Sequence, residues 1–135
     1  VRTVIRLSAD RAAGKLTRWH RIAAEASTQC GRPSVPVVEG PQPFDQFILK
    51  LPRGSCALMP TLAVRAKPLG KMLNAARRPR AAVALIGPEG DFTPEEVLRA
   101  QRAGVRPVSL GSLTLRSETA ALVLVAILQH RWGSL

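Results

Sequence analysis

Apolar residues in the first half of the chain predict one long helix followed by short elements. Five of them recur at three- and four-residue steps: Leu16, Trp19, Ala23, Ala26 and Cys30. This spacing predicts an amphipathic helix over about residues 10–30, with Gly31 as its stop. The other elements expected in this half are a β-rich segment at Val1–Leu7, a strand at Val35–Val38, a helix near Phe44–Leu49 and an apolar strand at Ser55–Met59.

The second half of the chain alternates strand and helix patterns. A basic helix is expected at about Pro68–Arg77, followed by the run Ala81–Ile86, whose residues are apolar on both faces. Such a run is typical of a parallel strand covered by helices. A strand is expected again at Val105–Leu110. The alternation predicts an α/β domain with a mainly parallel sheet flanked by helices.

Two helix starts are marked by their capping residues. Thr93 is expected as an N-cap, with Pro94 at the first helical position and Glu96 closing a capping box. That helix should end before Gly104, and a last helix capped by Ser117 should run to about residue 131.

Length and composition favour one soluble domain with a real core. The chain has 135 residues, 46% of them hydrophobic. Its longest apolar run, 120–128, falls far short of the roughly 20 residues that span a bilayer. The two cysteines and two histidines lack metal-ligand spacing, so no metal is expected. With no signal peptide at the start, Cys30 and Cys56 are expected to be free, buried thiols in a cytoplasmic protein.

The charge is concentrated in two segments. The net charge is +11, of which residues 1–32 carry +5 (seven basic, two acidic) and residues 65–80 carry +6 with no acid. Clustered arginine is typical of a phosphate-binding surface, although a solvated basic face would give the same pattern. The arginines expected to bind RNA are Arg2, Arg6, Arg18, Arg77, Arg78 and Arg80.

Candidate chemistry lies at three strand ends, because ligands of open α/β sheets bind beyond the carboxyl ends of strands. These ends are Leu58–Pro60, Ile86–Phe92 and Leu110–Ala120. Gly87 and Gly90 would let the backbone approach a ligand, although a tight strand-to-helix turn would also need them. The loop is neither a Walker A nor a GxGxxG motif, so a nucleoside triphosphate is not favoured.

Two charged residues stand at the start of the last helix. The helix dipole explains Glu118, whereas Arg116 opposes the dipole, which suggests a role toward an anion or a partner chain. The same helix is apolar all round over 120–128. Such a helix is buried on every side, in its own domain or against a second subunit.

Together these motifs resemble the RsmE family of ribosomal RNA methyltransferases, of the SPOUT superfamily. The resemblance lies in Gly87–Gly90, in Leu110-Gly111 and in Leu115–Ala120. It extends upstream through Trp19, the run from Glu25 to Arg32, Pro36 and Leu58–Pro60, and so covers essentially the whole chain.

The resemblance implies a C-terminal deep trefoil knot that binds S-adenosylmethionine, and methylation of N3 of a uridine in 16S ribosomal RNA of the small subunit. It implies a homodimer through the C-terminal helix. Arg116 would face the cofactor and the uridine, and Glu118 would orient Arg116 or accept the proton. The implied cofactor-binding residues are Leu58, Met59, Pro60, Gly87, Pro88, Glu89, Gly90, Leu110, Gly111, Leu115 and Arg116.

The chain departs from the family pattern in three places. Asp91 stands where the family has a second glycine, and Leu113-Thr114 replace a pair such as Arg-Ile. The family's N-terminal PUA-like barrel has no counterpart, so residues 1–135 are expected to be the methyltransferase domain alone. Two alternatives stay open: a non-catalytic RNA-binding remnant of the fold, and a SPOUT methyltransferase with a different RNA target.

Overall fold

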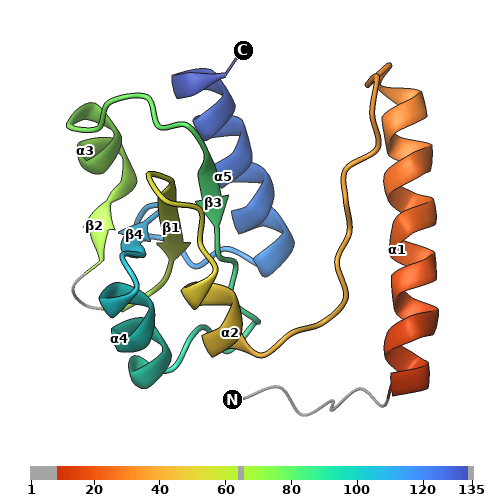
Figure 1. Cartoon of the computed structure of the whole chain (residues 1–135). Coiled ribbons are helices and arrows are strands. Elements are labelled where there is room, and N and C mark those ends of the chain that lie inside the picture. The colour runs from red at the N-terminus through yellow and green to blue at the C-terminus, as the bar shows by residue number, and fades with distance from the viewer. Residues whose placement is uncertain (1–8, 64–65, 134–135) are drawn as a thin grey trace. The chain divides into compact units, whose positions relative to one another are not determined.

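A computed structural model describes residues 9–63 and 66–133 (Figure 1). The predicted segment Val1–Leu7 lies outside these residues. The described residues up to Pro43 form one compact unit, and those from Phe44 onward form another.

The larger unit is built on a four-stranded parallel sheet. Its strands are β1 (Cys56–Pro60), β2 (Lys67–Pro68), β3 (Ala82–Ala84) and β4 (Arg106–Ser109), in the order β2-β4-β1-β3. Its helices are α2 (Phe44–Leu49), α3 (Leu69–Asn74), α4 (Pro94–Arg102) and α5 (Ser117–Trp132). Leu58 of the central strand β1 pairs with Ala84 on one side and with Arg106 on the other. The predicted parallel α/β sheet flanked by helices is therefore confirmed.

Side chains of β1 alternate between two hydrophobic cores, one on each face of the sheet. Ala57 and Met59 join a cluster with residues of α2 and α4, whereas Cys56 and Leu58 join one with residues of α3 and α5. Leu58 and Met59 are fully buried. β1 is thus held between the two cores, and the chain leaves the sheet at Pro60.

The edge strand β3 is less covered than its sequence suggested. Ala82 and Ala84 are exposed, so the expectation of a strand covered on both faces is wrong at these positions. The reason is that Ala82 and Ala84 line a surface hollow with Val125, Leu128 and Trp132 of α5, so the helix does not cover them fully.

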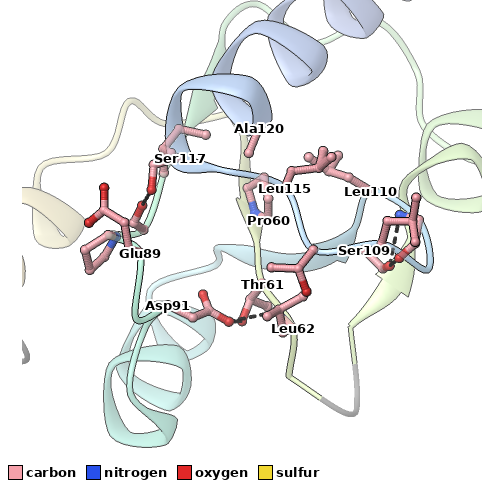
Figure 2. A pocket seen from close by; sticks show the side chains of 16 residues that line it. Pro60, Thr61, Leu62, Glu89, Asp91, Ser109, Leu110, Leu115, Ser117 and Ala120 are labelled. Carbon is pink, nitrogen blue, oxygen red and sulfur yellow. Dashed lines mark hydrogen bonds between the residues drawn. The ribbon is translucent and has the colours of Figure 1, made fainter.

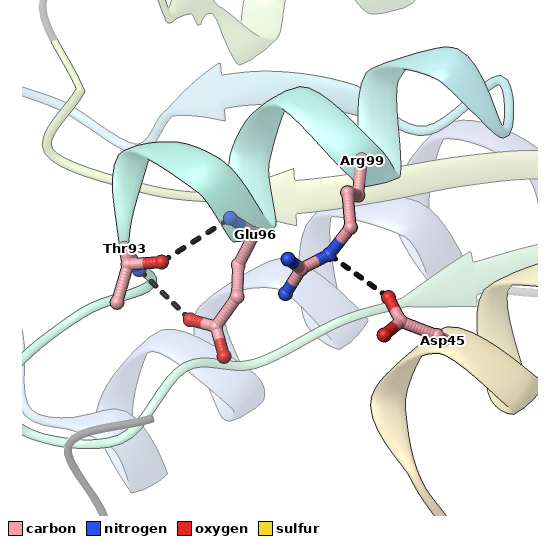
Figure 3. Close-up of polar contacts among 4 residues, drawn as sticks. All are labelled: Asp45, Thr93, Glu96 and Arg99. Carbon is pink, nitrogen blue, oxygen red and sulfur yellow. Dashed lines mark hydrogen bonds and ion pairs between the residues drawn. The ribbon is translucent and has the colours of Figure 1, made fainter.

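The start of α4 has the predicted capping box (Figure 3). The hydroxyl of Thr93 accepts a hydrogen bond from the amide of Glu96 at 3.2 Å, and the Glu96 carboxylate accepts one from the amide of Thr93 at 2.8 Å. An ion pair of 2.9 Å from Arg99 to Asp45 joins α4 to α2.

Three predictions about element ends and strands were wrong. No strand forms at Val35–Val38, since the prolines around it remove backbone donors that a strand needs. Helix α3 ends at Asn74, well before Arg77. The N-cap of α5 is Arg116, because the Ser117 hydroxyl donates instead to the carbonyl of Gly87 at 2.8 Å.

The smaller unit consists of α1 (Ala9–Gln29), as predicted from its periodicity, and the extended segment that follows. Cys30 is a free, exposed thiol, whereas Cys56 is free and buried, so the expectation of burial was wrong for Cys30. The helix ends there, and the residues after it leave the thiol uncovered. None of the described helices could cross a membrane, and the described residues contain no metal-binding cluster of His, Cys, Asp or Glu.

Candidate functional site

A pocket opens at the carboxyl edge of the sheet, where three segments meet (Figure 2). Pro60, Thr61 and Leu62 leave β1, and the loop from Ile86 to Asp91 follows β3. The third segment, after β4, contributes Ser109, Leu110, Gly111, Leu113, Thr114, Leu115, Ser117 and Ala120. The space between them is about 600 Å³, part of it open to solvent.

The pocket is lined mainly by apolar side chains and backbone. Among its described lining residues, Glu89 and Asp91 are the ones with titratable side chains. Glu89 is exposed, whereas Asp91 is partly buried. A ligand that fits here would be bound by apolar contact and by backbone N–H and C=O groups.

Asp91 joins the loop after β3 to the residues that leave β1. One carboxylate oxygen, Oδ2, accepts hydrogen bonds from the hydroxyl of Thr61 at 2.8 Å and from the amide of Leu62 at 2.7 Å. The other, Oδ1, accepts one from the amide of Phe92 at 2.8 Å. A charged acceptor strengthens all three bonds.

Asp91 has a backbone conformation that glycine would adopt readily. Its φ is +59°, in the left-handed region, and among the described residues it is the one non-glycine residue with a positive φ. Asp and Asn tolerate this region better than other residues with a Cβ. The departure therefore keeps the turn and adds a side chain that ties the loop to the end of β1.

Two serines join further parts of the pocket. Ser117 donates its hydroxyl to the carbonyl of Gly87 at 2.8 Å, which joins the start of α5 to the loop after β3. Ser109 donates to the carbonyl of Gly111 at 2.9 Å and accepts from its amide at 3.3 Å. Gly111 has φ +140°, a conformation that glycine adopts readily.

Seven of the predicted cofactor-binding residues line this pocket: Pro60, Gly87, Pro88, Glu89, Leu110, Gly111 and Leu115. Leu58, Met59, Gly90 and Arg116 are not among its lining residues. Leu58 and Met59 fill the two cores, and Gly90 is an exposed residue of the turn beside Asp91.

The two predicted catalytic residues are exposed at the start of α5. Arg116 is the N-cap and Glu118 lies in the first turn. The neighbours of Arg116 on both sides, Leu115 and Ser117, line the pocket. Within the described chain neither Arg116 nor Glu118 forms an ion pair, so the arginine is a free cation beside the pocket mouth.

Sequence reasoning missed nine residues that line the pocket: Thr61, Leu62, Ile86, Asp91, Ser109, Leu113, Thr114, Ser117 and Ala120. Most fall inside the three strand-end segments singled out above. The clearest available signal was Asp91, since an acid at a glycine position of a ligand loop needs a structural reason.

Four of the six arginines predicted to bind RNA lie within the described residues. Arg77, Arg78 and Arg80 are exposed on the connection between α3 and β3. Arg18 is exposed on α1, and Arg2 and Arg6 lie outside the described residues.

Comparison with known proteins places these features in one family. Residues 1–129 match the family model described as the RNA methyltransferase domain. The Ribosomal RNA small subunit methyltransferase E of Synechocystis is 38% identical over 83% of this chain and 37% of its own length. That of Mesomycoplasma hyopneumoniae is 28% identical over 82% of this chain and 47% of its own. The chain thus spans less than half of these relatives.

Two solved structures are also similar. A methyltransferase from Legionella pneumophila in complex with S-adenosylmethionine has a TM-score of 0.88 and 31% identity, over 99% of this chain and 53% of that one. The Ribosomal RNA small subunit methyltransferase E of Neisseria gonorrhoeae, bound to S-adenosylmethionine, has a TM-score of 0.85 and 35% identity, over 98% and 52%.

Proposed function

The chain belongs to the family of RNA methyltransferase domains, and we propose that it binds S-adenosylmethionine in the pocket at the carboxyl edge of the sheet and methylates N3 of a uridine in 16S ribosomal RNA. The match to the family model and the similarity to the curated relatives confirm the predicted family. The observation that carries the proposal is the pocket itself: Gly87–Glu89, Leu110-Gly111 and Leu115 line one cavity. The cofactor named in the two similar structures supports the choice of ligand.

The residues of the pocket suit this cofactor. The leucines of the third wall offer an apolar surface for adenine, while the backbone of the glycine-containing turns offers donors and acceptors. A larger residue at Gly87 would be crowded, because its Cβ would lie 3.0 Å from the ring of Phe92, which would have to shift. When bound, S-adenosylmethionine supplies a methyl group on a sulfonium, a good leaving group that needs no metal.

Little side-chain chemistry is then required of the protein. The pocket has to align the uridine nitrogen with the methyl group, which is an effect of orientation. We assign Arg116 to stabilise the negative charge that develops on the uracil as N3 loses its proton. We assign Glu118 to orient Arg116 or to accept that proton.

We further propose that the chain has the deep trefoil knot of SPOUT proteins and forms a homodimer through α5. The knot is supported by the resemblance of Leu110–Ala120 to the family's C-terminal motif, and the hydrogen bond from Ser117 to Gly87 holds this segment to the loop after β3. The dimer is supported by apolar residues of α5 that its own chain leaves exposed, namely Leu122, Val125 and Ile127. Action on the small ribosomal subunit would place the protein in the cytoplasm.

Asp91 bears on the alternative of a non-catalytic remnant. A drifted remnant would be expected to lose the contacts that shape its cofactor pocket. Asp91 instead accepts two short hydrogen bonds, from Thr61 and Leu62, that hold the loop after β3 to the end of β1. We therefore favour an active methyltransferase.

Calorimetric titration with S-adenosylmethionine tests the proposal, followed by methyl transfer to small ribosomal subunits and mapping of the modified nucleotide. Binding with micromolar affinity near one site per chain, and a methyl group on uridine N3, are expected. A folded protein that binds no cofactor would overturn the proposal. A methyl group at another nucleotide would retain the enzyme class and refute the target.

Two glycines provide a pair of variants for this titration. Gly111 and Gly54 both have positive φ, and neither has an atom near the place of an added Cβ. Alanine should strain the backbone by about 1 kcal/mol at Gly54, and by more at Gly111, whose φ of +140° lies outside the left-handed region that alanine tolerates. Since only Gly111 lines the pocket, Gly111→Ala should weaken cofactor binding, whereas Gly54→Ala should lower stability alone.

A further inference from the structure

A second groove lies beside the edge strand β2 and carries only positive charge. It is formed by α3, the residues that follow α4 and the start of β4. The charged side chains among its lining residues are Lys67, Lys71 and Arg106. Its space is about 1240 Å³, part of it open to solvent, and none of its lining residues also lines the cofactor pocket.

These three cations have no anionic partner in the described chain. All three are exposed, and the ion pairs of the described residues, Arg21–Glu25 and Arg99–Asp45, lie elsewhere. Arg106 makes one hydrogen bond, from Nη1 to the sulfur of Met72 at 3.7 Å. A thioether is a weak acceptor, so the guanidinium keeps its other donors for a ligand.

Apolar side chains also line the groove. Met72, Val105 and Pro107 are among its lining residues together with the three cations, and each is at least partly buried. A strand of RNA presents phosphates and apolar faces of sugars and bases together, which matches a lining that is both cationic and apolar. Inorganic anions or an acidic protein surface would use the charges alone.

The position of the groove along the chain points to the same ligand. Lys67 and Lys71 begin a stretch that continues through α3 to Arg77, Arg78 and Arg80 and holds no acid between residues 66 and 80. Arg106 adds a charge from β4, a strand far along the sequence, which composition could not have placed here. Folding thus extends the predicted basic segment by a residue outside it.

We propose that Lys67, Lys71 and Arg106 form a binding site for the phosphodiester backbone of RNA, separate from the methyl-transfer pocket. It would hold a part of the substrate strand away from the target uridine. This inference rests on the proposed function, because it takes RNA to be the substrate.

The experiment measures how salt affects the binding of a short fluorescein-labelled oligouridylate, by anisotropy. Removing one phosphate contact should lower the slope of log K against log salt by about 0.7. We expect a decrease of about 1.4 for Lys67→Gln/Lys71→Gln and about 2.1 when Arg106→Gln is added. The matched control is Lys50→Gln/Arg53→Gln, which removes the same charge as the double variant at exposed positions outside the groove.

Equal slopes for the groove variants and the control would overturn the site, since the effect would then be one of net charge. A wild-type protein that does not bind the oligouridylate would overturn it as well. If the triple variant is too unstable to measure, the single variant Lys71→Gln tests the site instead, because it changes one exposed residue. It should lower the slope by about 0.7.

Cofactor calorimetry on the same proteins separates this inference from the proposed function. Groove variants should bind S-adenosylmethionine as the wild type does. If the groove variants leave the salt slope unchanged and the protein still binds S-adenosylmethionine, only the proposed RNA site in the groove is refuted. A slope effect in a protein that binds no cofactor refutes the methyltransferase proposal and leaves the RNA site standing.

Discussion

Asp91 and Thr61, which both line the pocket, lie 30 residues apart in the chain and are joined by a hydrogen bond of 2.8 Å. Because Asp91 also accepts from the amide of Leu62, the loop after β3 is held to the end of β1 by a side chain and by backbone. A glycine at position 91 could adopt the same φ but could make neither contact. The substitution that looked like a departure from the family pattern therefore adds a support for the pocket.

Replacing Asp91 with alanine should loosen the pocket. The variant loses three hydrogen bonds to a charged acceptor and keeps the strained φ, so the free energy of unfolding should fall by about 2–3 kcal/mol. The affinity for S-adenosylmethionine should fall about tenfold, equivalent to about 1.4 kcal/mol. Urea unfolding and calorimetry measure the two effects.

Two further variants at this position separate the conformation of the loop from the tie. Asp91→Asn tolerates the left-handed conformation and keeps an acceptor oxygen, so it should recover part of both losses. Asp91→Gly removes the backbone strain but does not restore the hydrogen bonds to Thr61 and Leu62. Compared with Asp91→Ala, it should therefore recover more of the free energy of unfolding than of the affinity for the cofactor. If Asp91→Gly binds the cofactor as well as the wild type, the tie has no role in the pocket.

Arg116→Ala should separate binding from catalysis. The residue is exposed, forms no ion pair among the described residues, and opposes the dipole of α5. We therefore expect a change in stability below about 0.5 kcal/mol. If Arg116 stabilises charge on the uracil, kcat for methyl transfer should fall by about 10²–10³-fold.

The conservative variant Arg116→Lys, which keeps the charge, should retain part of the rate. Single-turnover methyl transfer to small ribosomal subunits, with the cofactor saturating, measures the chemical step. An unchanged rate in Arg116→Ala would remove the assigned role.

The parts of the fold that depend on neighbouring residues were predictable from the sequence, and the parts that depend on distant ones were not. The capping box of Thr93 and Glu96 involves residues three apart, and its pattern alone predicted it. Ser117 was predicted as a cap from its local pattern in the same way. Its hydroxyl instead donates a hydrogen bond to the carbonyl of Gly87, which lies 30 residues away.

The same distinction holds for the candidate site. The three strand ends could be expected to meet, because parallel strands present their carboxyl ends at one edge. The tie from Asp91 to Thr61 depends on the register of the sheet, and no short motif encodes it. Arg106 came close to Lys67 and Lys71 only because β4 pairs with β2.

The two thiols should differ in reactivity and in their effect on alkaline stability. Burial raises the pKa of the Cys56 thiol above its ordinary value of 9.0, although the charge of Arg106 partly opposes this. The raised pKa contributes stability that is fully present below pH 9.0 and is lost as pH rises from there through the pKa of the folded state. Cys56→Ala should therefore lose less stability than the wild type as the pH rises above about 9, as measured by urea unfolding at each pH.

Cys30→Ala is the control, since Cys30 is exposed and should leave the alkaline loss unchanged. Labelling with a thiol reagent under native conditions should modify Cys30 quickly and Cys56 only after unfolding. Equal labelling rates for the two thiols would contradict the burial of Cys56.

The exposed apolar face of α5 should determine the oligomeric state. Leu122 and Val125 are 73% and 50% exposed, and both lie in the apolar stretch 120–128 of the helix. Placing glutamate at both positions should convert a dimer into a monomer, because unpaired carboxylates would be buried in the interface. Leu98→Glu is the control, since Leu98 on α4 is 53% exposed and should leave the dimer intact. Sedimentation velocity measures the mass of all three proteins, and a dimer that survives both glutamates on α5 would exclude this helix as the interface.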